Sequence, residues 1–206
     1  MKLYLIAFFL FLLSACKTDD TSSSKVLLST PKKLSLTEFK EKVAPGDILL
    51  KRGKGPISQT IVRELKETIP LSHCAIVAET DSLVLINSIS GSLAEKDGLQ
   101  LTSLENFYAD AFPESIYIIR AFDSTKIYKI EREAIRLYNK NIPFDHDFNH
   151  LDSSKLYCSE FVEYVLYNIY QTTFFGKKKW KNRTLLTFNE LLYSDSFFIV
   201  NQKSEN

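Results

Sequence analysis

The pattern of apolar and polar positions beyond residue 43 predicts a mixture of strands and helices. Apolar runs bounded by turn residues predict strands at 48–51, 72–78, 83–89, 99–101, 116–120 and 197–200. Apolar residues spaced by three or four predict helices at 57–68 and 125–140, another that opens near residue 158, and a short one at 188–192. A short turn separates strands 72–78 and 83–89, which favours antiparallel pairing. We therefore expect one α+β unit.

The helix that opens near Cys158 carries the most informative residue of the chain. Its apolar stripe comprises Cys158, Phe161, Val162, Val165, Leu166 and Ile169. The other side comprises Ser159, Glu160, Glu163, Tyr167 and Asn168. A thiol in the first turn lies near unpaired N–H groups and the positive end of the helix dipole, and both favour the nucleophilic thiolate. The alternative is a small buried hydrophobic residue at the start of a core helix.

His73, on a predicted strand, is the candidate base for this thiol. Because neighbouring strand residues point to opposite faces, His73 and Cys74 face away from each other. If His73 faces a cleft, Cys74 lies in the core, and Cys158 is the thiol that His73 would deprotonate. The alternative is a histidine that makes ordinary hydrogen bonds and takes no part in chemistry.

Asn87 is the candidate for the group that orients the His73 ring. It interrupts the apolar run of strand 83–89, where a polar side chain needs a partner. If this strand pairs with the strand of His73, the amide oxygen of Asn87 would accept a hydrogen bond from the ring. The alternative is a polar residue that caps the loop at the strand end.

The N-terminus has the pattern of an export signal. Lys2 precedes an apolar run over residues 3–13 that is too short for an ordinary transmembrane span, and Leu13-Ser14-Ala15-Cys16 follows. This pattern resembles a bacterial lipoprotein signal, which implies that residues 1–15 are removed and that Cys16 carries lipid. The alternative is an uncleaved membrane anchor.

The lipoprotein resemblance also implies a location in the bacterial cell envelope. Acyl chains on Cys16 would hold the protein on a membrane. Residues 16–31 are then a polar tether, and residues 32–206 form a single domain. Lys17-Thr18-Asp19-Asp20 resembles an acidic signal of surface lipoproteins, so the periplasmic and surface faces of the outer membrane both stay open.

Charge and cysteine content narrow the class of protein further. Removal of residues 1–15 takes away Lys2 and no acidic residue, so 25 basic residues remain against 25 acidic residues. This balance gives no sign of a nucleic-acid partner. With Cys16 lipidated, Cys74 and Cys158 are left in the domain, and a disulfide between them is an alternative in an exported protein.

The order of these segments resembles a known family. Its motifs are, in chain order, Pro45-Gly46-Asp47-Ile48-Leu49, Leu71-Ser72-His73-Cys74-Ala75-Ile76-Val77, Pro143-Phe144-Asp145 with Phe148, and Leu156-Tyr157-Cys158-Ser159-Glu160-Phe161-Val162. Over about residues 43 to 200 the chain resembles the YiiX-like family of circularly permuted papain-like proteins. This family belongs to the NlpC/P60 superfamily and is related to lecithin retinol acyltransferase. The resemblance implies an antiparallel sheet packed against helices, including the helix that bears the cysteine.

The resemblance further implies a Cys–His thiol hydrolase or acyltransferase in which histidine precedes cysteine along the chain. Cys158 falls on the nucleophile and His73 on the base. The family often has Glu where this chain has Asn87. An amide would still orient the ring, but it would stabilise the imidazolium form less than a carboxylate does. No cofactor is expected.

Other residues are expected around the cleft. The backbone N–H of Cys158 is a natural donor to an oxyanion, and the hydroxyl of Tyr157 either adds to it or only packs. The resemblance implies that Phe144, Asp145 and Phe148 form a wall near the cleft.

Two polar segments have competing interpretations. His146 and His150 are four residues apart with carboxylates between them, and one interpretation of this spacing is a metal site. Their segment precedes the helix as a loop, so we expect no metal there. The basic run at 177–183 is expected to be a solvated loop, although Trp180 within it permits contact with anionic lipid or envelope polymer.

Three functions compete on this basis. The first is a lipid-anchored cysteine hydrolase that cleaves an amide or ester through a thioester. Its acyl donor would be a cell-wall peptide, an acylated amino acid or a lipid. The second is a lipid acyltransferase, which needs an acceptor site and exclusion of water. The third is an envelope binding module that keeps the papain-like shape without catalysis.

Overall fold

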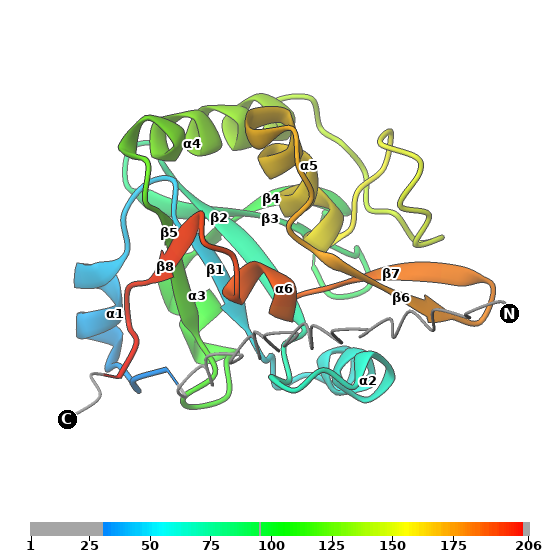
Figure 1. Ribbon diagram of the computed structural model, residues 1–206, viewed down its shortest axis with the longest axis horizontal. Coiled ribbons are helices and arrows are strands. Elements are labelled where there is room, and N and C mark those ends of the chain that lie inside the picture. Colours follow the sequence, from blue (N-terminus) through cyan, green and yellow to red (C-terminus); the bar gives the residue numbers. More distant parts are fainter. Residues whose placement is uncertain (1–30, 95, 204–206) are drawn as a thin grey trace, which may run out of the picture.

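A six-stranded sheet forms the centre of the computed structural model, which describes residues 31–94 and 96–203 (Figure 1). The strand order is β4-β3-β2-β1-β5-β8, and every neighbouring pair is antiparallel. The strands are β1 (Ile48–Lys51), β2 (His73–Glu79), β3 (Leu83–Ile89), β4 (Gly98–Ser103), β5 (Tyr117–Ala121) and β8 (Phe197–Ile199). The prediction of an α+β unit with an antiparallel sheet is confirmed.

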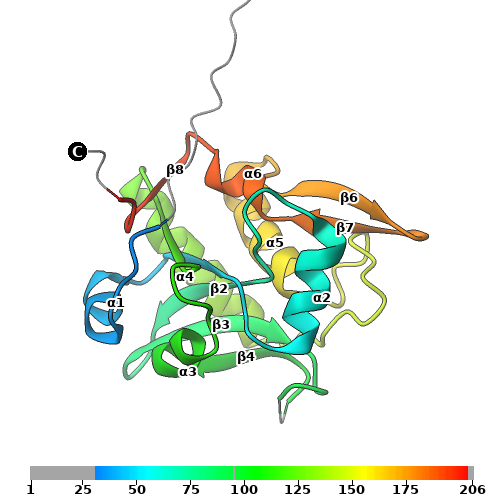
Figure 2. The same cartoon turned by 90° about the horizontal axis from the view of Figure 1, so that it is seen from below.

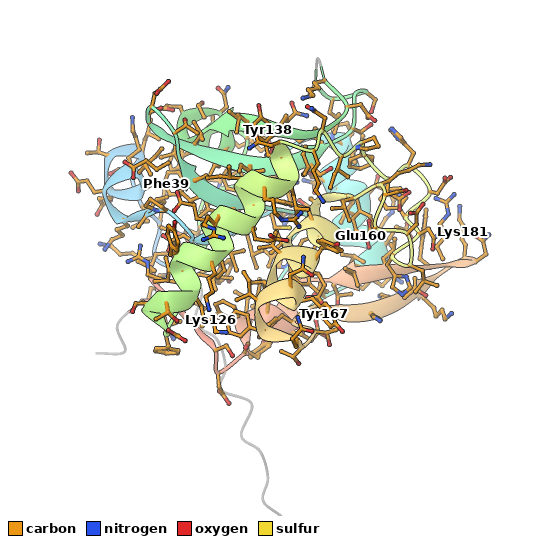
Figure 3. All side chains as sticks on the ribbon, turned by 90° about the horizontal axis from the view of Figure 1, so that it is seen from above. Phe39, Lys126, Tyr138, Glu160, Tyr167 and Lys181 are labelled. Atoms are coloured by element: carbon orange, nitrogen blue, oxygen red, sulfur yellow. The ribbon has the colours of Figure 1, made fainter. Side chains whose placement is uncertain are left out.

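Helices cover both faces of this sheet. Helices α4 (Ser124–Tyr138) and α5 (Cys158–Tyr170) lie side by side across one face, as seen from above in Figure 3. The shorter α1 (Leu36–Lys42) and α3 (Leu104–Ala109) pack on the other face. Figure 2 shows α2 (Pro56–Leu65) beside the hairpin of β6 (Gly176–Trp180) and β7 (Arg183–Thr187), and α6 (Asn189–Leu192) follows that hairpin.

The alternation of β2 places consecutive residues in two different cores. Cys74 belongs to the core beneath α4 and α5, whereas Ala75 and Val77 belong to the core beneath α1 and α3. His73 shares the face of Ala75 and Val77, and its ring centroid lies 6.1 Å from that of Phe107 in α3. The predicted opposition of His73 and Cys74 is therefore present.

The Pro-Gly-Asp turn before β1 is linked to β5 by hydrogen bonds between Asp47 and Arg120. Gly46 has a φ of +81°, and a Cβ at this position would lie 2.4 Å from the carbonyl oxygen of Ile127, so both backbone and space require glycine. The fully buried carboxylate of Asp47 accepts the N–H of Ala44 at 2.8 Å and two N–H groups of Arg120.

The basic run at 177–183 is not the solvated loop that we expected, because most of it pairs as the β6–β7 hairpin. The hairpin is held against α2. Nε1 of Trp180 donates to Oε2 of Glu64 at 2.9 Å, and Nζ of Lys178 donates to the carbonyl oxygen of Leu65. These contacts with α2 stabilise the pairing of the two strands, although their sequence is polar.

No helix within residues 31–94 and 96–203 is long and apolar enough to cross a membrane. The expected signal peptide at residues 1–15, the lipidation site Cys16 and all but the last residue of the tether at 16–31 lie outside the described residues.

Candidate active site

Cys158 is the first residue of α5, as the sequence predicts. Its N–H therefore lies in the first turn, where such groups have no partner within the helix. The N–H of Tyr157, the residue before it, donates to Oε2 of Glu160 at 3.1 Å. Ser159 and Glu160, which lie on the side of the helix opposite the predicted apolar stripe, are both buried. The carboxyl group of Glu160 points inward and caps the start of the helix.

The pKa of the Cys158 thiol lies well below its ordinary value. The largest cause is hydrogen bonding from the Cys74 thiol, and burial opposes it; a hydrogen bond with His73 and the charge of His73 lower the pKa further. Burial raises the pKa of Cys74, which is fully enclosed. Both cysteines are free thiols, so the alternative of a disulfide between them is not formed. Of the two, Cys158 is the one that ionises first.

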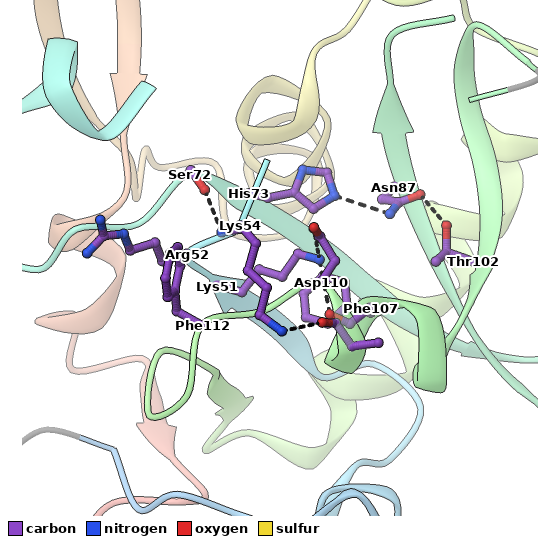
Figure 4. Close-up of polar contacts among 12 residues, drawn as sticks. Lys51, Arg52, Lys54, Ser72, His73, Asn87, Thr102, Phe107, Asp110 and Phe112 are labelled. Atoms are coloured by element: carbon purple, nitrogen blue, oxygen red, sulfur yellow. Dashed lines mark hydrogen bonds and ion pairs between the residues drawn. The ribbon is translucent and has the colours of Figure 1, made fainter. Parts of the chain in front are cut away.

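Asn87 holds the other side of the His73 ring, as shown in Figure 4. Nδ2 of Asn87, rather than the amide oxygen that we expected, lies 3.2 Å from Nε2 of His73. The oxygen Oδ1 of Asn87 instead accepts a hydrogen bond from Oγ1 of Thr102 at 3.2 Å. The antiparallel pairing of β2 with β3 brings these side chains together. Because Nε2 faces Asn87, Nδ1 is the ring nitrogen left for the thiol of Cys158.

Ser88 ties the segment before α5 to the sheet. Its buried hydroxyl donates to the carbonyl oxygen of Leu156, and the N–H of Leu156 donates to the carbonyl oxygen of Pro143 at 3.0 Å. The start of α5 is therefore fixed to the strand that carries Asn87, which sets the position of Cys158 relative to His73.

Tyr157 joins an aromatic wall beside the nucleophile. Its hydroxyl oxygen accepts the N–H of Leu186 at 3.0 Å, and burial raises its pKa well above the ordinary range. The ring of Phe148 lies 5.1 Å from that of Tyr157 and 6.1 Å, edge-on, from that of Phe144. The hydroxyl oxygen of Tyr157 is thus already engaged by β7. Its predicted role as a donor to the oxyanion stays a prediction.

Asp145 supports this wall without lining the cleft. Its buried carboxylate accepts the N–H groups of Asp147 and Asn149 within its own loop. These contacts stabilise the turn between Phe144 and Phe148, and both of these aromatic side chains line the cleft.

A groove of about 740 Å³ runs past Cys158 and His73. Its walls come from α2, the β6–β7 hairpin, the loop at 143–148 and α3. Most of the lining is apolar and includes Ile57, Ile61, Leu65, Phe144, Phe148 and Trp180. A site of this size and character suits a substrate with a large apolar group.

The end of the groove near His73 is polar. Lys51 is the cross-strand partner of His73, and its buried Nζ contacts Oδ2 of Asp110 at 2.8 Å and the carbonyl oxygen of Phe107 at 3.0 Å (Figure 4). Burial lowers the pKa of Lys51. Sequence reasoning missed both Lys51 and Thr102, because only the pairing of the strands reveals their proximity to His73 and Asn87.

The two histidines of the 145–150 segment do not converge on one site. Nε2 of His146 lies 3.0 Å from Oδ1 of Asp97, while burial and then the charges of Lys177 and Lys179 lower the pKa of His150. Within the part of the chain that the structure describes, no group of three or more His, Cys, Asp or Glu side chains is placed to hold a metal ion.

A cysteine at the start of a helix, packed on an antiparallel sheet that presents a histidine, defines the papain-like class of thiol enzymes. Here the histidine precedes the cysteine, which is the permuted order. Residues 42–197 match the family described as "Permuted papain-like amidase enzyme, YaeF/YiiX, C92 family". Because the match covers more than half of the chain, this protein belongs to that family and is a cysteine hydrolase. The predicted membership of a YiiX-like family is confirmed.

A solved structure has the same fold. It is titled "Crystal structure of metalloprotein yiiX from Escherichia coli O157:H7", and it aligns with a TM-score of 0.62 at 16% sequence identity. The alignment covers 79% of this chain and 98% of that chain. At this identity the likeness shows the fold alone. A comparison with curated proteins found no match.

Proposed function

We propose that the protein hydrolyses N-acyl amides with an apolar acyl group, using Cys158 as nucleophile and His73 as base. The observation that carries this proposal is the meeting of a thiol of lowered pKa and a histidine held by Asn87 in one groove. This arrangement supplies the nucleophile and the proton carrier that acyl transfer needs.

The reaction follows from these groups. The Cys158 thiolate attacks the amide carbonyl carbon, and the backbone N–H of Cys158 donates to the oxygen as it becomes negative. The imidazolium of His73 gives its proton to the leaving nitrogen, the C–N bond breaks, and a thioester remains on Cys158. His73 then takes a proton from water, whose oxygen attacks the thioester and releases the carboxylic acid and the thiol.

The apolar lining of the groove supports a long acyl group over a short one. Residues of α2 and of the β6–β7 hairpin both line it, including Ile61 and Leu185. Transfer of each methylene from water to such a surface contributes about 0.8 kcal/mol. Among the possible acyl donors, an acylated amino acid or a lipid amide fits this groove better than a polar cell-wall peptide.

We place this enzyme on a membrane of the bacterial cell envelope. The basis is the lipoprotein signal at residues 1–15 and the expected lipid on Cys16, with residues 16–31 as a tether. A tethered enzyme with an apolar groove would meet acylated substrates at the bilayer surface. Detection of acyl chains on Cys16 by mass spectrometry tests this placement.

Acyl transfer to an amine or alcohol is the second candidate reaction. The apolar groove favours it, because such a lining disfavours the water that hydrolyses the thioester. The two reactions share the acyl-enzyme and differ only in what attacks it. A comparison of product ratios with and without an added amine or alcohol acceptor separates them.

The test is to trap the acyl-enzyme. Purified full-length protein in detergent is mixed with N-acyl anilides of increasing chain length, quenched with acid and analysed by mass spectrometry. We expect a mass increase equal to the acyl group on the peptide with Cys158, absent in Cys158→Ala. Failure to form an adduct or turn over any amide or ester, with normal folding, would refute the catalytic proposal and favour a binding module.

A further inference from the structure

Thr102 and Asn87 occupy one face of two paired strands. In the register of β3 with β4, Leu85 is opposite Thr102 and Asn87 is opposite Gln100. Thr102 and Asn87 are therefore diagonal neighbours whose side chains share a face. The same face of β2 carries His73, so a continuous chain of polar contacts runs from Thr102 through Asn87 to His73 (Figure 4).

The amide orientation in this chain of contacts suits only a His73 ring whose Nε2 carries no proton. The Nδ2 group of Asn87 faces Nε2 of His73, so Nε2 must accept, and a neutral ring then carries its proton on Nδ1. In the neutral tautomer that can take the thiol proton at Nδ1, and in the imidazolium that pairs with the Cys158 thiolate, Nε2 carries a proton and needs an acceptor. Rotation of the Asn87 amide by half a turn would present Oδ1 to Nε2 and place Nδ2 against Thr102.

A threonine hydroxyl can serve both amide orientations. In the orientation shown, Oγ1 of Thr102 donates to Oδ1 of Asn87. After rotation the same oxygen would accept from Nδ2, because a hydroxyl is both donor and acceptor. Asn87 is only 1% exposed, so its amide depends on protein partners. A buried N–H left without an acceptor is tolerated less than a carbonyl left without a donor.

We infer that Thr102 is a positioning residue for the proposed reaction, which acts through Asn87 to satisfy the amide whether or not Nε2 of His73 carries a proton. This inference rests on the proposed roles of Cys158 and His73. A valine at position 102 keeps the shape of threonine but offers Nδ2 no acceptor. It therefore disfavours the rotated amide and, with it, the imidazolium–thiolate pair.

The test measures the rate of Cys158 alkylation by iodoacetamide against pH in the full-length protein, with the modified peptide identified by mass spectrometry. In Thr102→Val we expect the rise in rate to move to higher pH and the rate near pH 6 to fall roughly threefold to tenfold. Thr102→Ser keeps the hydroxyl and should restore the wild-type profile. If Thr102→Val does not fold, Thr102→Ala provides the same comparison.

The control is the Asn87→Ala background. If Thr102 acts through Asn87, Thr102→Val should cause no further shift of the pH profile there. A Thr102→Val profile equal to wild type, while Asn87→Ala is shifted, would overturn the inference, and so would an equal shift in the presence and absence of Asn87. If Thr102 had a purely structural role, Thr102→Val would lower the melting temperature and leave the pH profile of Cys158 alkylation unchanged. An ordinary titration of Cys158 in the wild type would instead refute the proposed nucleophile itself.

Discussion

The fully buried thiol of Cys74 interacts with the thiol of Cys158 and is the largest influence that lowers the pKa of Cys158. The interaction joins β2 to the first residue of α5. Because His73 precedes Cys74 on the same strand and also lowers the pKa of Cys158, two consecutive residues that point to opposite faces both act on one thiol. Cys74 therefore both packs in the core and lowers the pKa of the candidate nucleophile.

Replacement of Cys74 by alanine should raise the pKa of Cys158, because the thiolate loses a hydrogen-bond donor. We therefore expect a slower alkylation of Cys158 near pH 6, because less of the thiol is ionised there. Cys74→Ser, which keeps a donor of similar size, should recover part of the reactivity. If the alkylation profile of Cys74→Ala coincides with that of the wild type, the Cys74 thiol does not stabilise the thiolate.

Glu160 should make the protein less stable as pH rises from about 4.5 to about 8, because burial raises the pKa of Glu160 to about 8. In this window the folded state holds a proton that the unfolded state releases, so unfolding is favoured as the proton concentration falls. Glu160→Gln keeps an acceptor for the N–H of Tyr157 and cannot ionise.

The free energy of unfolding in urea, measured at pH 5 and pH 8.5, tests this prediction. The loss between these pH values should be smaller in Glu160→Gln than in the wild type, by on the order of 1–2 kcal/mol after allowance for solvent screening. Other acidic groups titrate equally in both proteins and cancel in the comparison. Parallel pH dependences would show that Glu160 is ionised in the folded protein at neutral pH.

The ion pair of Asp47 and Arg120 should be important for stability but not for reactivity of the thiol. Arg120→Met leaves the carboxylate of Asp47 buried without its cation, and we expect a loss of about 3–5 kcal/mol at neutral pH. Burial already raises the pKa of Asp47, so the loss should be smaller at pH 5, where the carboxyl is more readily protonated. Urea denaturation measures it. In the Asp47→Asn background, the effect of Arg120→Met should be much reduced, and an undiminished effect would contradict the pairing.

Local sequence was sufficient to predict the elements that carry the candidate nucleophile and base. The 3.6-residue period from Cys158 onward favours a helix, and the β-rich segment around His73 favours a strand. Both are conformational preferences of a short segment by itself. The position of Cys158 in the first turn and the opposite orientations of His73 and Cys74 follow from these local rules. Both are present in the structure.

Contacts that depend on register could not be predicted in this way. Thr102 reaches Asn87 only because β3 and β4 pair with a particular offset, and Cys74 reaches Cys158 only because α5 packs on β2. The burial of Glu160 and the pairing of the basic β6–β7 hairpin likewise arise from tertiary contacts that override local polarity. For Thr102, Cys74 and the hairpin, the deciding contact comes from another strand or helix, about which periodicity carries no information.

Ile61 provides a test of where the acyl chain lies. It belongs to α2, is half-buried and lines the groove that passes Cys158. Ile61→Trp would fill part of this groove and should lower kcat/KM for long-chain N-acyl substrates while short-chain substrates are little affected. For each methylene that the larger side chain excludes, we expect roughly a fourfold loss. The slope of kcat/KM against chain length measures the effect.

Two comparisons make the Ile61 result specific to the groove. Tyr128→Trp alters an exposed side chain on α4, outside the groove lining, and should leave the dependence on chain length unchanged. Ile61→Val makes only a small change of volume and should leave the slope nearly as in the wild type. A uniform loss for all chain lengths in Ile61→Trp would mean that the nucleophile had been displaced. An unaltered slope would place the acyl chain on another surface, because a filled groove cannot accept the same chain with the same affinity.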